Sequence, residues 1–250
     1  MSSHAEHRPK RHATLRIRLL NGFGLSAGER AVPVPGGAER LLAFLALHDR
    51  SVSRHLVAAT LWPEVPEHRA YANLRSALAR LDGMGRQALD IGPTEVRLAD
   101  GVTVDLAEAR SLAERVIHPA EHGQDGPLDS AAVAELSAEL LPGWYEDWAM
   151  RAAAEWQGLR LHALEALTGQ LMREGRLPDA VTAATAAVQA DPLRESARVK
   201  LIEAHLAEGN EADALLVFQS YERLLKAELG LHPTPRLSAL VASLHTVTRR

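Results

Sequence analysis

The stretch from Pro66 to Leu81, PEHRAYANLRSALARL, carries side chains that bond nucleic acid at the spacing of an amphipathic helix. Arginine bonds guanine edges and phosphates, asparagine bonds adenine edges, and serine bonds either. The polar side chains of the predicted outer face are His68, Arg69, Asn73, Arg75, Ser76 and Arg80. This composition is typical of a helix that reads a major groove, and a solvated helix surface often has it too.

Apolar residues recur at three- and four-residue spacing on the opposite face of the same stretch. They are Ala70, Leu74, Ala77, Leu78 and Leu81. Pro66 suits the first turn of a helix because its missing N–H needs no partner there, and Glu67 suits the positive end of the helix dipole. Gly83 and Gly85 end the pattern. The sequence therefore predicts a helix from near Pro66 to Leu81 with its apolar stripe in the core.

The residues before this helix predict a small sheet and two further helices. Alternation over residues 15–19 and turns at Asn21-Gly22 and Ala27-Gly28-Glu29 predict an antiparallel sheet over residues 15–34. The apolar density of residues 38–48 predicts a buried helix, and Ser51 or Ser53 can cap the next helix, which runs to Trp62.

A hairpin is predicted after the helix, over residues 88–98 with a turn at Gly92-Pro93-Thr94. A small sheet, three helices and a hairpin are the order of a winged helix-turn-helix, which places its second motif helix in the major groove. Arg97 on the hairpin would then lie near a phosphate or the minor groove, or be an ordinary surface residue.

The second half of the chain contains an internal repeat: GRLPDA from Gly175 recurs as GNEADA from Gly209, 34 residues later. This is the length of a tetratricopeptide unit, in which glycine lies at the turn and alanine lets the paired helices approach. Residues 104–118 predict a further helix with Asp105 near its start. Because three units are usually needed for stability, residues 131–171 with Trp144, Trp148 and Trp156 are expected to form the first layers.

Composition favours a soluble, cytoplasmic protein. The 250 residues are 46% hydrophobic, the longest apolar run (Leu41 to Leu47) is too short for a bilayer, and the absence of cysteine fits a reducing compartment. Residues 1–100 carry 14 Lys and Arg against 10 Asp and Glu, a net charge of +4, whereas residues 101–250 have a net charge of −8. The first hundred residues are thus the half suited to a polyanion. Residues 1–14 predict a disordered tail.

Motifs for enzyme chemistry are missing from the sequence. The histidines form no H-E-x-x-H pattern, no nucleophile elbow occurs, and Gly22, Gly24 and Gly28 have the wrong spacing for a dinucleotide loop. No phosphate-binding G-x-x-x-x-G-K-[ST] loop is present. We therefore expect no catalytic residue, no metal and no cofactor.

Four motifs in this order resemble the SARP type of bacterial transcriptional activators: LRIRLLNGFGL, ERLLAFLALHDRSVSRHLVAATLW, ANLRSALARL, and LLPGWYEDW with repeats ending in ELGLHPTP. The resemblance covers residues 15 to about 246. It implies a winged helix of the response-regulator type followed by a bacterial transcriptional activator domain (BTAD) of tetratricopeptide-like helices. It further implies activation at promoter repeats, often of secondary-metabolite gene clusters, by recruitment of RNA polymerase holoenzyme. Under this resemblance, the loop from Trp62 to Glu67, with Glu64 between them, is the candidate contact for the polymerase.

The resemblance places the family's recognition helix on Arg69 to Leu81, where this chain departs from the usual pattern. Ala79 and Asp82 stand where relatives tend to have arginines and an aromatic residue, and a carboxylate repels phosphates. We expect a mainly α protein with a small β content: a DNA-binding winged helix over 15–100 and an all-α helical domain over 101–250 that dimerises on DNA at the nucleoid. The alternative is a tetratricopeptide-like adaptor whose winged helix no longer reads DNA.

Overall fold

A computed structural model describes residues 14–122 and 130–242. Its contacts divide the chain into two compact units. The first unit comprises Met1–Ala107 with Leu140–Ala152, and the second comprises Glu108–Glu139 with Ala153–Arg250. No helix within the described ranges is long and apolar enough to cross a membrane. The predicted tail lies outside these ranges except for its last residue, and the division into independent domains at residue 100 stays a prediction.

A four-stranded sheet with the order β3-β2-β1-β7 opens the first unit. Strands β1 (Leu15–Arg18), β2 (Gly24–Ala27) and β3 (Arg30–Ala31) are antiparallel, as the alternation predicted. Strand β7 (Thr103–Val104) pairs in parallel with β1 and was not predicted. Its two residues are too few to carry a periodic pattern, and their partner lies far away in the sequence.

Three helices follow the sheet: α1 (Gly36–Ala46), α2 (Arg54–Leu61) and α3 (Glu67–Arg80). The structure selects Ser53 as the cap of α2, because its Oγ accepts a hydrogen bond from the Leu56 N–H at 3.1 Å. Pro66 occupies the cap position of α3, and its carbonyl accepts hydrogen bonds from the N–H groups of Arg69 and Ala70. The predicted start near Pro66 is therefore confirmed.

A second sheet, of order β4-β6-β5, forms the wing. The predicted hairpin is β5 (Leu89–Ile91) with β6 (Glu95–Leu98), and β4 (Val52–Ser53) adds a strand that was not expected. Gly83 and Gly85 were expected only to end α3, yet they lie in the short helix α4 (Gly83–Gln87). Leu81 leaves the helical conformation, with φ −76° and ψ 120°, and thereby separates α3 from α4.

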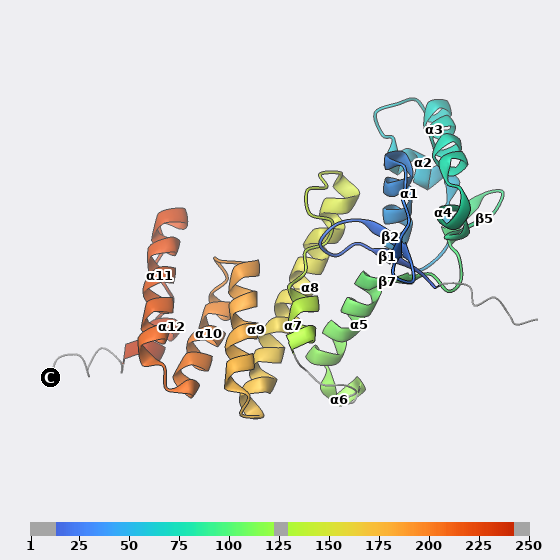
Figure 1. The fold of residues 1–250 in the computed structure, drawn as a ribbon. Helices are drawn as coiled ribbons and strands as arrows, with labels where there is room; N and C mark the ends of the chain where they lie inside the picture. The colour runs from blue at the N-terminus through green and yellow to red at the C-terminus, as the bar shows by residue number, and fades with distance from the viewer. Residues whose placement is uncertain (1–13, 123–129, 243–250) are drawn as a thin grey trace, which may run out of the picture. The chain divides into compact units, whose positions relative to one another are not determined.

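Helices make up the rest of the described chain. They are α5 (Asp105–Ile117), α6 (Pro119–His122), α7 (Ser130–Ser137), α8 (Asp147–Arg173), α9 (Leu177–Ala190), α10 (Glu195–Glu208), α11 (Glu211–Leu229) and α12 (Pro235–Ala242). Figure 1 shows α9, α10 and α11 as consecutive helices in a row, and α10 packs against both neighbours. Gly175 and Gly209, with φ of 74° and 82°, make the two turns of the repeat, which only glycine adopts easily. The mainly α fold with small N-terminal sheets is as predicted.

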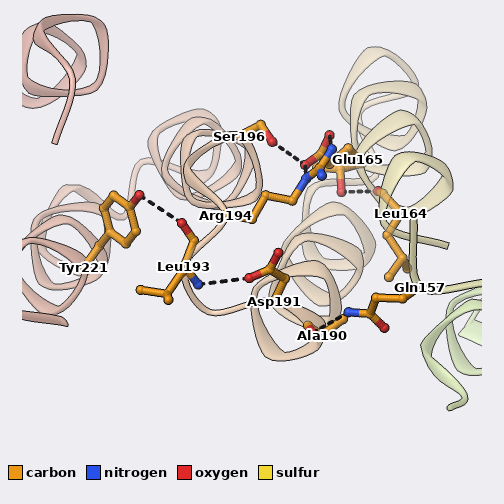
Figure 2. A network of polar contacts seen from close by, with 10 residues as sticks. Gln157, Leu164, Glu165, Ala190, Asp191, Leu193, Arg194, Ser196 and Tyr221 are labelled. Atoms are coloured by element: carbon orange, nitrogen blue, oxygen red, sulfur yellow. Dashed lines mark hydrogen bonds and ion pairs between the residues drawn. The ribbon is translucent and has the colours of Figure 1, made fainter. Parts of the chain in front are cut away.

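Polar contacts join neighbouring helices of the second unit (Figure 2). Glu165 of α8 accepts hydrogen bonds from Arg194 Nε at 2.7 Å and from Ser196 Oγ at 2.6 Å, at the start of α10. Gln157 Nε2 donates to the Ala190 carbonyl at 2.6 Å, and the Tyr221 hydroxyl donates to the Leu193 carbonyl at 3.1 Å. These bonds fix the register of helices that otherwise meet through small apolar side chains.

The three tryptophans within residues 131–171 divide between the two units. Trp156 is buried in the second unit, where its Nε1 donates to the Ala138 carbonyl at 2.8 Å. Trp148 belongs to the first unit, where its ring meets Phe44 of α1 edge-on at 5.5 Å, and Trp144 contacts Phe23. The expectation that all three lie in the first helical layers was therefore wrong for Trp144 and Trp148, because residues 140–152 pack with the winged helix.

Candidate nucleic-acid interface

The buried face of α3 anchors it in the first unit. Ala70, Leu74, Ala77 and Leu78 are buried, and Leu81 is buried directly after the helix. Helix α3 packs against α2 and α1. The predicted stripe is thus confirmed, and it fixes which side of the helix remains in solvent.

The opposite face of α3 presents the polar side chains. His68, Arg69, Arg75, Ser76 and Arg80 are exposed and Asn73 is half-buried. Within residues 14–122 and 130–242, none of these side chains hydrogen-bonds or forms an ion pair with another residue. Their donors are therefore available to a ligand, and no internal bond must break first.

Helical geometry arranges the polar residues in two rows, since successive residues are about 100° apart. Arg69, Asn73, Ser76 and Arg80 follow one line along the axis. Arg75 lies about 130° away from the mean direction of this line, and His68 lies on the same side as Arg75. The crest between the rows carries Ala72 and Ala79, whose methyl groups let a surface approach the helix closely.

Arg97 lies on the wing but its donors are occupied. Its Nε lies 3.1 Å from Asp90 Oδ2 and its Nη1 lies 2.9 Å from Asp100 Oδ1. The hydrogen bonds that Arg97 donates to these two carboxylates, Asp100 first, raise the pKa of Arg97 above its ordinary value. Asp90 faces Arg97 across the hairpin, a pairing that follows from the strand register and that the sequence reasoning missed.

Asp82 is exposed two residues after Arg80 and occupies the cap position of α4 without a side-chain cap bond. Its carboxylate is thus available to repel phosphates near the end of α3.

A hollow of about 210 Å³, here called the α2–α3 cup, lies between the two helices of the motif. It is lined by His55, Ala58, Ala59, Trp62, Pro63, Val65, Glu67 and Ala70. Trp62 and Glu67 were polymerase-contact candidates from the sequence, and both line the cup, whereas Glu64 is exposed on the loop between them. Sequence reasoning missed the cup itself, although the small residues Ala58 and Ala70 on facing helices were its available signal.

The described parts of the chain contain no cluster of three His, Asp or Glu side chains able to hold a metal ion. The arrangement on α3 can donate hydrogen bonds and positive charge to an extended polyanion.

Comparison with known proteins gives one family. The bacterial transcriptional activator domain matches residues 104–245, which is more than half of the chain. Regulatory protein AfsR of Streptomyces coelicolor is 34% identical over 213 residues, and AfsR of Streptomyces griseus is 30% identical over 209 residues. Each alignment covers 80% of this chain and 21% of the relative, so the chain spans about a fifth of their length.

A solved structure also shares the fold. Mycobacterium tuberculosis EmbR, determined in complex with a low-affinity phosphopeptide, aligns with a TM-score of 0.65 at 23% sequence identity. The alignment covers 94% of this chain and 65% of that one. The matched family is one of transcriptional activators and not of enzymes. The chain therefore belongs to the bacterial transcriptional activator domain family of SARP-like regulators, with a winged-helix region before its helical domain.

Proposed function

We propose that this chain activates transcription by inserting α3 into the major groove of promoter DNA. The observation that carries the proposal is the division of α3 into a fully packed apolar face and an outer face of unpaired donors, including Arg69, Arg75 and Arg80. A helix that faced only solvent would need neither the aligned row nor the small crest residues.

The two rows suggest different roles. Arg69, Asn73, Ser76 and Arg80 span about 16 Å along the helix, enough to follow several base pairs. Asn73, half-buried in the middle of the row, is suited to adenine, and the methyl groups of Ala72 and Ala79 on the crest are suited to thymine. Arg75 in the other row is suited to a backbone phosphate.

A single such helix supports only modest affinity, because few phosphates are neutralised. We therefore infer that two copies bind a pair of promoter repeats as a homodimer, each reading one repeat. The chain would then recruit RNA polymerase holoenzyme through Trp62, Glu64 and Glu67, in the cytoplasm at the nucleoid. A secondary-metabolite gene cluster is the target class that we propose.

Arg97 has a lesser part in this proposal. Its guanidinium forms ion pairs with Asp90 and Asp100, so its main role is to stabilise the wing. Arg97 would contact DNA only if a phosphate replaced one of these two carboxylates.

The test is a mobility shift on the promoters that flank the gene, titrated with salt and compared with unrelated DNA. We expect a specific shift that weakens with salt and is lost in the Arg75→Ala/Arg80→Ala double variant. The matched control is Arg173→Ala/Arg236→Ala, which removes two exposed arginines from the second unit.

The result that would overturn the proposal is equal promoter binding by the double variant and the wild type. Absence of any DNA binding above the nonspecific level at low salt would instead favour a protein-binding adaptor, consistent with the exposed Asp82 beside the helix.

A further inference from the structure

Arg40 of α1 joins the end of α2 to a segment that lies far away in the sequence. Its Nη2 donates a hydrogen bond to the Leu61 carbonyl at 3.1 Å, and its Nε lies 2.9 Å from Glu146 Oε1. The Glu146 oxygen lies off the axis of the Nε–H, so this second contact is an ion pair and not a straight hydrogen bond. The two side chains are 36% and 30% exposed, so water screens their attraction only partly. One guanidinium thus links three parts of the first unit: α1, the last residue of α2, and residues 140–152.

The Leu61 carbonyl marks the end of α2. The last four carbonyls of a helix have no partner inside the helix, and an arginine suits them because it adds positive charge at the negative end of the helix dipole. Arg40 supplies this contact from α1, and Trp62 then leaves the helical conformation, with φ −135° and ψ 61°. The guanidinium therefore holds the point at which the chain turns from α2 toward α3.

The connection from Leu61 to α3 is short and stiff. Pro63 and Pro66 fix two of the backbone φ angles in residues 62–66. The Pro66 carbonyl accepts hydrogen bonds from N–H groups in the first turn of α3. A displacement of the Leu61 carbonyl is therefore carried to the start of α3, because the loop has little freedom to absorb it.

Residues 140–152 are fixed on the first unit by contacts other than the ion pair. The Leu141 N–H donates a hydrogen bond to the Leu19 carbonyl at 2.9 Å. The ring of Trp148 meets Phe44, which lies one turn along α1 from the guanidinium. Glu146 lies between these two attachments, so its carboxylate reaches the guanidinium from a backbone that is already held in place.

We propose that Arg40 and Glu146 are positioning residues for DNA recognition. Glu146 holds the guanidinium, the guanidinium holds the Leu61 carbonyl, and the stiff loop passes this position on to α3. Neither residue touches DNA. The DNA-reading unit thus extends beyond the wing and includes residues 140–152. This inference rests on the proposed function, in which α3 enters the major groove, and it specifies what orients that helix.

The opposite charges of the two residues separate positioning from a direct effect of charge. Arg40→Met removes both contacts and keeps the aliphatic stem, whereas Glu146→Gln keeps the shape of the side chain and removes its negative charge. If the variants acted through their charge on the phosphates, loss of the carboxylate would tighten DNA binding and loss of the guanidinium would weaken it. Positioning predicts that both variants weaken promoter binding.

The test compares full-length proteins by fluorescence anisotropy on the promoters that flank the gene and on unrelated DNA, over a series of salt concentrations. The double variant Arg40→Met/Glu146→Gln is included. The matched controls are Lys200→Met and Glu203→Gln, because the side chains of this ion pair within α10 are also 36% and 30% exposed. Both controls should bind promoter DNA as the wild type does.

Promoter affinity should fall about tenfold in Arg40→Met and about threefold in Glu146→Gln, while affinity for unrelated DNA changes by less than about twofold. The slope of affinity against salt concentration should stay that of the wild type, because no phosphate contact is lost. The double variant should bind no more weakly than Arg40→Met, since both residues act through one guanidinium.

Glu146→Gln is the decisive variant, because its amide fits the same space and the protein should fold even if Arg40→Met does not. Promoter affinity in Glu146→Gln that equals or exceeds that of the wild type would overturn the inference and leave the proposed function intact. An equal loss on promoter and unrelated DNA would also overturn it, since partial unfolding lowers both alike, and so would a changed salt slope. If the wild type does not prefer the promoter, the proposed function is overturned, and this inference with it.

Discussion

The carboxylate of Asp105 accepts a hydrogen bond from the backbone N–H of Leu19 at 2.8 Å, across 86 residues of sequence. It also accepts from Leu20 at 3.1 Å and from Leu106 at 2.8 Å. One buried side chain thus ties the start of α5 to the end of β1, beside the parallel pairing of β7 with β1. The connection that follows the wing is thereby fixed to the N-terminal sheet.

Removal of this carboxylate should destabilise the protein. Asp105→Ala leaves buried N–H groups of Leu19 and Leu20 without their acceptor, at a cost of about 3 kcal/mol in the free energy of unfolding. Urea denaturation at neutral pH measures the loss. Asp105→Asn is the matched control, because its amide oxygen keeps part of the bonding, and it should lose less. Equal stability of wild type and Asp105→Ala would show that the bonds contribute nothing net.

The same residue predicts a pH dependence. Burial raises the pKa of Asp105 above its ordinary value of 3.8, although the three backbone N–H groups oppose the shift. The folded state therefore holds this proton more tightly than the unfolded state, so the contribution of Asp105 to stability falls as pH rises from about 3.8 through the raised pKa. The stability advantage of wild type over Asp105→Asn should accordingly be larger at pH 4 than at pH 7. An advantage that grows toward pH 7 would reverse the sign.

Local features of the chain were predictable from the sequence. The stripe on α3, the hairpin from β5 to β6 and the 34-residue repeat each follow from a pattern of residue types that can be seen directly along the chain. Features that join distant segments were not: β7 beside β1, Trp148 on Phe44, and Asp105 on Leu19. The pattern of residues around each of these positions gives no information about a partner that lies far away in the sequence.

The candidate site divides in the same way. Which side chains of α3 point outward follows from helical spacing, so that part was predictable. The carboxylates that hold Arg97 depend on the strand register, and the α2–α3 cup depends on how closely two helices approach. Whether the outward residues bind DNA stays a prediction until variants are measured.

The two serines before α2 provide a test of capping. Ser53→Ala removes the acceptor for the Leu56 N–H and should lower the free energy of unfolding by about 1 kcal/mol. Ser51→Ala, two residues earlier and outside the cap, should leave stability unchanged in the same denaturation experiment. A similar loss in both variants would mean that the cap is not the cause.

Removal of the Asp82 carboxylate should increase the affinity for promoter DNA. Asp82→Asn removes an exposed carboxylate near the end of α3 and should tighten promoter binding about two- to fivefold at low salt, because one repulsion with phosphate is lost. The gain should shrink as salt screens the interaction. Glu29→Gln, at the turn between β2 and β3, is the matched control in fluorescence anisotropy titrations. Unchanged affinity in Asp82→Asn would place the phosphates away from this residue.

Arg97 should behave differently from the arginines of α3. Since Asp90 and Asp100 already occupy its guanidinium, Arg97→Ala is expected to change promoter affinity by less than about twofold. The Asp90→Asn/Asp100→Asn background frees the side chain, and there Arg97→Ala should weaken binding. A large loss from Arg97→Ala alone would assign the wing a direct DNA contact.

The contact between Glu165 and Arg194 should couple α8 to α10 energetically. The side chains are 15% and 26% exposed, and the two nitrogens of Arg194 lie 2.7 and 3.4 Å from the two carboxylate oxygens, a bidentate geometry. Because water screens such a pair only partly, a double-mutant cycle with Glu165→Gln and Arg194→Met should give a coupling of about 1 kcal/mol. Thermal unfolding of the four proteins measures it. The pair of Lys200 and Glu203 within α10, whose side chains are more open to solvent at 36% and 30% exposure, is the control, with an expected coupling of about 0.3 kcal/mol. Equal coupling energies in the two pairs would mean that the contact between α8 and α10 adds no more stability than an ion pair within one helix. The packing of the alanines of α9 would then be the main interaction that stabilises the repeat.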